Sequence, residues 1–189
     1  MSKFLKVLFS LFFLVLAFGF VKASVVDARV IYKVKAPVAS PTPTPTVAPV
    51  SSFDLFWPMV AGKTMESKVY FLKTAKENLR GLLIFGAPQK ADYGVFLSVK
   101  RVLEAELLIN SSKNDLAIKT LDRANDLLTK ASSEITSDTP KPVEYETIKN
   151  RLDNLIKLVD SLSLKTDGDV KSKLGETHNL IVTLLEKLK

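Results

Sequence analysis

From residue 64 to the C-terminus, apolar residues recur every three or four positions, the spacing that places them on one face of an α-helix. The pattern predicts helices at 64–85, 88–109, 115–136, 144–164 and 169–189. Short polar or proline-containing turns separate them, which favours antiparallel neighbours. We therefore predict an all-α fold, an antiparallel helical bundle of three helices plus a C-terminal helical hairpin.

The first predicted helix carries one apolar stripe. Its members lie three, four or seven positions apart and are Met65, Val69, Leu72, Leu79 and Leu83. Thr64 is suited to cap the start of this helix, because a threonine hydroxyl can accept a hydrogen bond from an amide of the first turn. We expect the stripe to pack against the two helices that follow.

A break between the third and fourth helices divides the helical region. Residues 137–143 contain Pro140 and Pro142, and proline interrupts a helix because it lacks an amide hydrogen and clashes with the preceding turn. The break separates a three-helix domain at 59–138 from a hairpin at 139–189. Because a hairpin cannot bury its stripe alone, it must pack on the first three helices or on another copy of itself.

The chain begins with a different apolar pattern. Residues 7–21 are uncharged and follow Lys3 and Lys6, while Val21 and Ala23 fit the cleavage site of an export signal. A helix of this length covers roughly 22 Å, less than the roughly 30 Å apolar core of a bilayer. The pattern therefore favours a signal peptide at 1–23.

The alternative is that this N-terminal segment stays uncut as a membrane anchor. In both cases the lysines hold the N-terminus inside and place the rest of the chain outside. The expected location is extracytoplasmic. Cleavage after Ala23 gives a secreted or periplasmic protein, whereas an uncut chain stays anchored in the cytoplasmic membrane with its C-terminus outside.

Residues 24–58 are expected to form an extended Pro/Thr-rich linker, a disordered stalk. Five of the nine prolines lie within residues 36–52, and they favour an extended polyproline II chain of about 3.1 Å per residue, or roughly 50 Å in all. Residues 24–35 alternate β-branched and polar positions, so a short strand stays open as an alternative to an extended lead-in.

An aromatic lead-in ends this linker. Phe53, Phe56 and Trp57 are candidate interaction residues, because such side chains suit a partner surface or a membrane surface. The alternative is a lid that folds back over the helices, since a large exposed apolar patch is uncommon on a monomer.

Composition excludes several kinds of chemistry. The chain has no cysteine and one histidine, His178, which leaves no thiolate site and too few ligands for an ordinary zinc or di-iron site. Removing residues 1–23, with three lysines, lowers the net charge from +7 to +4, too balanced for a nucleic-acid binder. We therefore predict no catalytic residues, no metal and no cofactor.

A family signature runs through the first two predicted helices. An aromatic lead-in with a proline precedes a Tyr-x-x-Lys helix, and a Lys-Ala pair opens a second helix rich in Arg and Glu. This pattern, strongest over 56–108 and traceable over 53–135, resembles a helical domain family of unknown function in small exported or membrane-anchored proteins of uncultured bacteria. The resemblance implies an extracytoplasmic helical domain and brings no catalytic residues. The matching positions are Pro58, Tyr70, Lys73, Lys90, Ala91, Arg101, Glu104 and Ala105.

These patterns together predict a non-enzymatic exported or membrane-anchored helical domain that acts as a protein-interaction or structural module on the outer side of the membrane. The expected partners are the membrane, through the N-terminal segment, and a protein or a second copy, through the C-terminal hairpin. No nucleic acid is expected. The alternative function is an extracytoplasmic bundle that binds a small apolar ligand between its helices.

Overall fold

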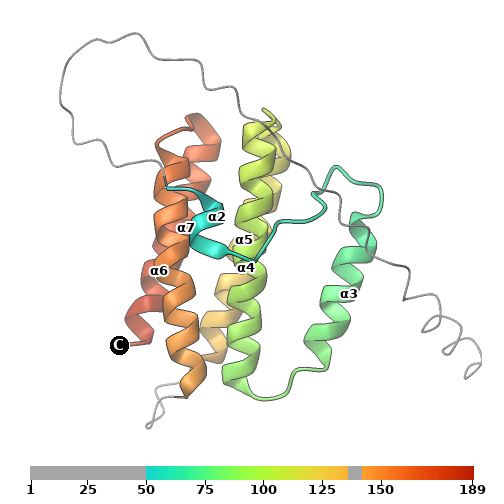
Figure 1. Cartoon of the computed structure of the whole chain (residues 1–189). Helices are drawn as coiled ribbons and strands as arrows, with labels where there is room; N and C mark the ends of the chain where they lie inside the picture. Colours follow the sequence, from blue (N-terminus) through green and yellow to red (C-terminus); the bar gives the residue numbers. More distant parts are fainter. Residues whose placement is uncertain (1–49, 136–141) are drawn as a thin grey trace, which may run out of the picture. The chain divides into compact units, whose positions relative to one another are not determined.

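The computed structural model describes residues 50–135 and 142–189, and within them all regular secondary structure is α-helical (Figure 1). The prediction of an all-α fold is confirmed. The predicted signal residues Lys3, Lys6, Val21 and Ala23, the strand alternative and most of the stalk lie outside the described residues, as do residues 136–141. The helices are α2 (Ser52–Phe56), α3 (Tyr70–Leu82), α4 (Ala87–Asn110), α5 (Asn114–Glu134), α6 (Val143–Ser163) and α7 (Gly168–Lys187).

Four of these helices form a bundle. Helix α4 packs against α5 and α6, and α7 packs against the same two helices. Short turns connect α4 to α5 and α6 to α7, so each pair is an antiparallel hairpin. The C-terminal hairpin therefore buries its apolar stripe against α4 and α5, one of the two arrangements that the sequence allowed.

The core of the bundle consists of aliphatic side chains from all four helices. Burying one such side chain completely stabilises the fold by about 1.5–3 kcal/mol relative to leaving it in water. Because the chain has no disulfides, this packing is the main source of its stability. The fully buried residues include Val95, Val99, Leu121, Leu128, Ile148, Leu152, Leu155, Leu174, Ile181 and Leu184.

Helices α4 and α5 approach closely at a glycine. A Cβ atom added at Gly94 would lie 3.2 Å from the Cβ atom of Ala131 and 3.4 Å from the carbonyl oxygen of Leu127. The first distance is shorter than most contacts of a Cβ atom, and the second is a van der Waals contact with backbone, which cannot move aside as a flexible side chain would. The packing of these two helices therefore depends on a missing side chain at position 94.

We expect Gly94→Val to lower the free energy of unfolding by about 1–3 kcal/mol, because overfilling a packed interface forces the helices apart. Gly175, inside α7, is the matched control, since a Cβ atom there meets nothing within 4 Å. Gly175→Val should stay within about 0.5 kcal/mol of the parent chain. Urea denaturation measures both, and equal losses would contradict the close approach.

Helix α3 starts later than predicted. Residues 64–69 form turns, in which the amide of Ser67 donates to the carbonyl of Thr64 at 3.0 Å, so the predicted cap at Thr64 is wrong. The ammonium of Lys73 donates to the carbonyl oxygens of Ala61, at 2.7 Å, and Lys63, at 2.9 Å. These bonds hold the preceding segment beside α3 instead of continuing it as a helix.

The apolar stripe of α3 also faces the wrong way for the predicted packing. Leu72, Leu79 and Leu83 are exposed, and Leu79 keeps 61% of its surface accessible. The prediction that this stripe packs against the following helices is therefore wrong. The opposite face of α3 contacts α4 instead, through the charged side chains that form the candidate site. In residues 50–135 and 142–189, no helix has both the length and the apolar character of a membrane span.

Candidate functional site

The polar face of α3 meets α4 in a buried ion cluster. We use this name for Tyr70, Lys73 and Glu77 of α3 together with Arg101 and Glu104 of α4. Arg101 pairs with both carboxylates, and its Nη1 atom lies 2.6 Å from Oε1 of Glu104. Lys73 also pairs with Glu104, whose side chain is fully buried. One carboxylate of α4 is thus surrounded by two cations, one from each helix.

Neighbouring groups complete the ion cluster. The hydroxyl of Tyr70 donates to Oε2 of Glu104 at 3.1 Å, and the ammonium of Lys100 donates to Glu77 at 3.1 Å. The guanidinium of Arg123, from α5, lies 5.5 Å from the centre of the Tyr70 ring, within the range of a cation–π contact. Within residues 50–135 and 142–189, no buried side-chain nitrogen or oxygen lacks a hydrogen-bond partner.

Electrostatics keep most members of the ion cluster in a defined protonation state. Burial alone would raise the pKa of Glu77, but Arg101 and Lys100 outweigh it and hold that pKa below its usual value. Burial raises the pKa of Tyr70, so its phenol stays protonated and acts as a donor. Burial would lower the pKa of Arg101, yet the carboxylates and Tyr70 raise it, so the guanidinium stays charged.

Lys73 is the member whose charge is held least firmly. Burial lowers the pKa of its ammonium, and the pull of Glu104 in the opposite direction does not restore it. Each charge in the ion cluster is neutralised by a neighbour, so the arrangement fixes the rotation of α3 about its own axis. A buried ion pair of this kind specifies orientation more than it adds stability, because desolvation opposes the Coulomb attraction.

Fixing this rotation turns the apolar face of α3 to the solvent. We call this face the α3 stripe. Leu82, the last residue of α3, keeps 76% of its surface accessible, and several exposed side chains of this kind on one helix are unusual for a monomer. The members of the α3 stripe are Phe71, Leu72, Leu79 and Leu82 of α3, and Leu83 and Phe85, which follow the helix. Leu82 lies at the edge of the stripe, beside a groove between α3 and the α4–α5 hairpin.

The exposed charges between positions 67 and 86 have one sign. Lys68, Lys76 and Arg80 are exposed. The one acidic residue between positions 67 and 86 is Glu77, which is buried in the ion cluster. The accessible surface of this segment therefore combines apolar side chains with positive charge.

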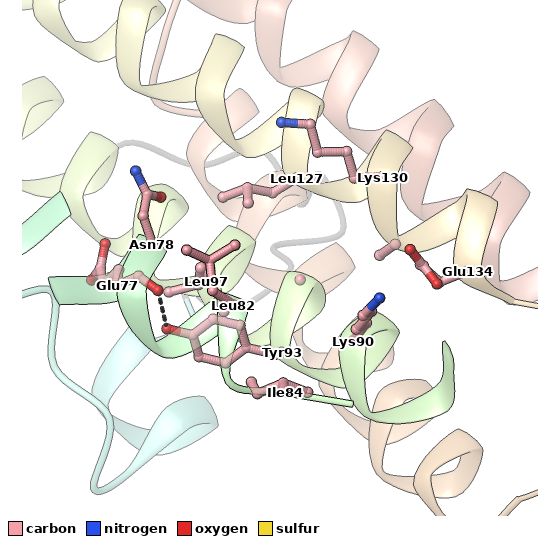
Figure 2. A pocket seen from close by; sticks show the side chains of 13 residues that line it. Glu77, Asn78, Leu82, Ile84, Lys90, Tyr93, Leu97, Leu127, Lys130 and Glu134 are labelled. Carbon is pink, nitrogen blue, oxygen red and sulfur yellow. Dashed lines mark hydrogen bonds between the residues drawn. The ribbon is translucent and has the colours of Figure 1, made fainter. Parts of the chain in front are cut away.

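A groove runs between α3 and the α4–α5 hairpin. Its volume is about 440 Å³, and Figure 2 shows Leu82, Leu97 and Leu127 along it with Lys130 and Glu134 farther along α5. The hydroxyl of Tyr93 crosses from α4 and donates to the backbone carbonyl of Glu77 at 3.0 Å, drawn as the dashed line. The groove has an apolar lining with ionic groups at its edge.

The aromatic residues singled out from the sequence divide between two environments. Phe56 is buried against the core, and α2 contacts α6, where the Nδ2 atom of Asn154 donates to the carbonyl of Leu55 at 3.1 Å. Phe53 and Trp57 are exposed, with ring centroids 4.7 Å apart. The lid and the exposed patch thus each describe part of this segment, and neither belongs to the ion cluster.

Sequence reasoning reached the ion cluster only in part. Tyr70, Lys73, Arg101 and Glu104 were identified through the family signature, without any indication that they meet. Glu77 was missed, although a signal was present. Its position, four residues after Lys73 and seven after Tyr70, places all three on the face opposite the α3 stripe.

One family model matches the chain. It is the domain of unknown function DUF5667, and the match covers residues 62–176, which is more than half of the chain. The chain belongs to the DUF5667 family. The predicted membership of a helical domain family of unknown function is confirmed. No curated protein and no solved structure matched the chain.

The DUF5667 match relates the site to the family. It includes the whole ion cluster and the α3 stripe, and it continues through α6 into α7. It begins after the aromatic lead-in, so Phe53, Phe56 and Trp57 lie outside it. The DUF5667 region of this chain therefore contains both the outward apolar face of α3 and the charges that orient it.

Proposed function

We propose that this DUF5667 protein is a non-enzymatic, exported or membrane-anchored module that works on the outer side of the membrane and binds another surface through the α3 stripe. The observation that carries the proposal is the outward orientation of this stripe. Each of its leucines and phenylalanines forgoes up to about 1.5–3 kcal/mol of burial energy while it faces water. A patch of this kind marks an interaction site more often than a monomer surface.

Placement outside the membrane is supported by the sequence. The uncharged run at 7–21 behind Lys3 and Lys6 has the pattern of an export segment, and the proline-rich residues that follow are suited to a spacer. A domain held on such a spacer can reach a binding partner, and the α3 stripe is the face that we propose for this contact.

The C-terminal hairpin is a weaker interaction surface than the α3 stripe. Its apolar residues, such as Leu152 and Leu174, are fully buried against the rest of the bundle. Self-association through the hairpin would require that packing to open first. We therefore place the interaction on α3, and self-association through the hairpin stays a prediction.

Photocrosslinking in cells tests the proposal. The full chain is expressed in a bacterium with benzoyl-phenylalanine at position 79, inside the α3 stripe, or at position 164. Leu164, at the end of α6, is 72% exposed and serves as the matched control site. We expect adducts at position 79 and few at 164.

Any specific adduct at position 79, whether with a protein, a second copy or a lipid, supports the interaction surface. Equal yields at the two positions would contradict it. Placement outside is tested separately, by adding protease to spheroplasts. A fully protected domain would refute that half of the proposal.

The groove between α3 and the α4–α5 hairpin favours a second candidate function, the binding of a small apolar ligand. Its volume of about 440 Å³ lies within the range of ligand pockets, and Leu82, Leu97 and Leu127 give it an apolar lining. Native mass spectrometry of the purified chain would show a retained ligand as added mass. A spectrum with only the mass of the polypeptide would count against this candidate.

A further inference from the structure

We propose that the α3 stripe binds a phospholipid surface with anionic headgroups, with α3 lying in the plane of the interface. This inference rests on the proposed function, because it names the partner of the same interaction surface. It follows from the juxtaposition of an outward apolar stripe and exposed basic side chains on one helix whose opposite face is fastened to α4.

The geometry suits an interfacial helix. Helix α3 has 13 residues, so its axis is about 20 Å long, too short to cross a bilayer but long enough to lie along one. Interfacial helices immerse an apolar face rich in Leu and Phe by about 5–10 Å and keep their polar face away from the acyl chains. The α3 stripe contains only leucine and phenylalanine.

The ion cluster makes this surface permanent. Lys73 and Glu77 fasten α3 to Glu104 and Arg101 of α4, so the stripe cannot turn inward without separating buried charges. The binding face is therefore present before any lipid arrives. Prior organisation of this kind lowers the entropy lost on binding.

The charge pattern favours lipid over a second copy. Lys68, Lys76 and Arg80 are exposed around the stripe, and the one acid of this segment, Glu77, is buried. Two copies meeting through the same face would bring like charges together, whereas anionic headgroups complement them. The attraction is expected to weaken with salt, because these charges are exposed.

The experiment measures insertion at single sites, because the apolar N-terminal run can attach the full chain to vesicles by itself. The chain has no cysteine, so Leu79→Cys and Leu164→Cys each provide one site for an environment-sensitive fluorophore. Each labelled full-length protein is mixed with vesicles of phosphatidylglycerol and phosphatidylcholine that carry spin-labelled acyl chains. We expect quenching at position 79 to exceed that at position 164 at least twofold.

A charge-reversed variant tests the role of the basic residues. Lys68→Glu combined with Lys76→Glu should reduce quenching at position 79 several-fold, and vesicles of phosphatidylcholine alone should do the same for the parent chain. Because both side chains are exposed and outside the ion cluster, the thermal melting of the variant should match that of the parent.

Equal quenching at positions 79 and 164 would overturn the lipid proposal. A spectral shift at position 79 that appears without vesicles and rises with protein concentration would identify a second copy as the occupant and would also overturn it. In either case, a photocrosslinking adduct at position 79 with another protein or with a second copy would still support the proposed interaction surface.

Discussion

Glu104→Gln is expected to lower the free energy of unfolding by about 3 kcal/mol. Removing one partner of a buried ion pair leaves the other charge without compensation, at a cost of about 3–5 kcal/mol. Glu104 is fully buried and contacts Lys73, Arg101 and Tyr70. The lower end of the range applies because Arg101 keeps Glu77 as a second partner.

Urea denaturation measures this loss, and amide hydrogen exchange locates it. We expect exchange to accelerate mainly in α3, because α3 depends on these contacts more than the bundle does. Glu106→Gln is the matched control on the same helix, since Glu106 is half-buried and takes part in no ion pair of the cluster. Equal losses for the two variants would contradict the role assigned to Glu104.

Leu152→Ala is expected to lower the free energy of unfolding strongly, whereas the same substitution at Leu79 should leave it nearly unchanged. Leu152 is fully buried in α6, so its truncation should lower the free energy of unfolding by about 2–5 kcal/mol. Leu79 is exposed on α3, and alanine is as good a helix former as leucine. Leu79→Ala should therefore change the free energy of unfolding by less than about 0.5 kcal/mol.

The comparison tests the orientation of α3 directly. Both variants are measured by thermal and urea denaturation of the full chain in the absence of lipid. A loss of 2 kcal/mol or more, roughly the core value, for Leu79→Ala would mean that the α3 stripe is buried in solution. The binding proposals would then lose the surface on which they depend.

The bundle helices could be predicted from the sequence because their hydrophobic period and their burial agree. The third helix was expected at 115–136 and is α5, Asn114–Glu134, while the fourth was expected at 144–164 and is α6, Val143–Ser163. In both helices most of the apolar residues that recur every three or four positions, such as Leu121 and Leu152, are fully buried. Where the apolar stripe of a helix faces the core, the spacing of apolar residues is sufficient to predict both the helix and its buried face.

The orientation of α3 could not be predicted in the same way. Periodicity identifies an apolar face but does not state what covers it, and a charged face is normally read as the one in water. Here Lys73 and Glu77 find partners at Glu104 and Arg101, more than twenty positions along the chain. Such a long-range match of charges leaves no local pattern in the sequence. Periodicity alone therefore predicts that the apolar face of α3 is buried, whereas the structure buries its charged face.

The candidate site was accessible only through the family signature. Tyr70 and Lys73 stood out because the resemblance carried them, and Arg101 and Glu104 because they followed in the second helix. Composition indicated an ordinary mixed surface charge, and it gave no reason to bury any of these groups. The aromatic lead-in was found from its composition, but its division into a buried Phe56 and an exposed Trp57 depends on how α2 meets α6.

The bonds from Lys73 to the carbonyls of Ala61 and Lys63 have a mechanical consequence. Lys73 belongs to α3 and the same ammonium pairs with Glu104, so one charge joins the segment before α3, α3 itself and α4. A force that pulls Ala61 away from the bundle is therefore resisted by α4 as well as by the first turn of α3. The α3 stripe therefore belongs to a helix that is fastened at its N-terminal end, and it cannot be peeled from that end without breaking an ion pair with the buried Glu104.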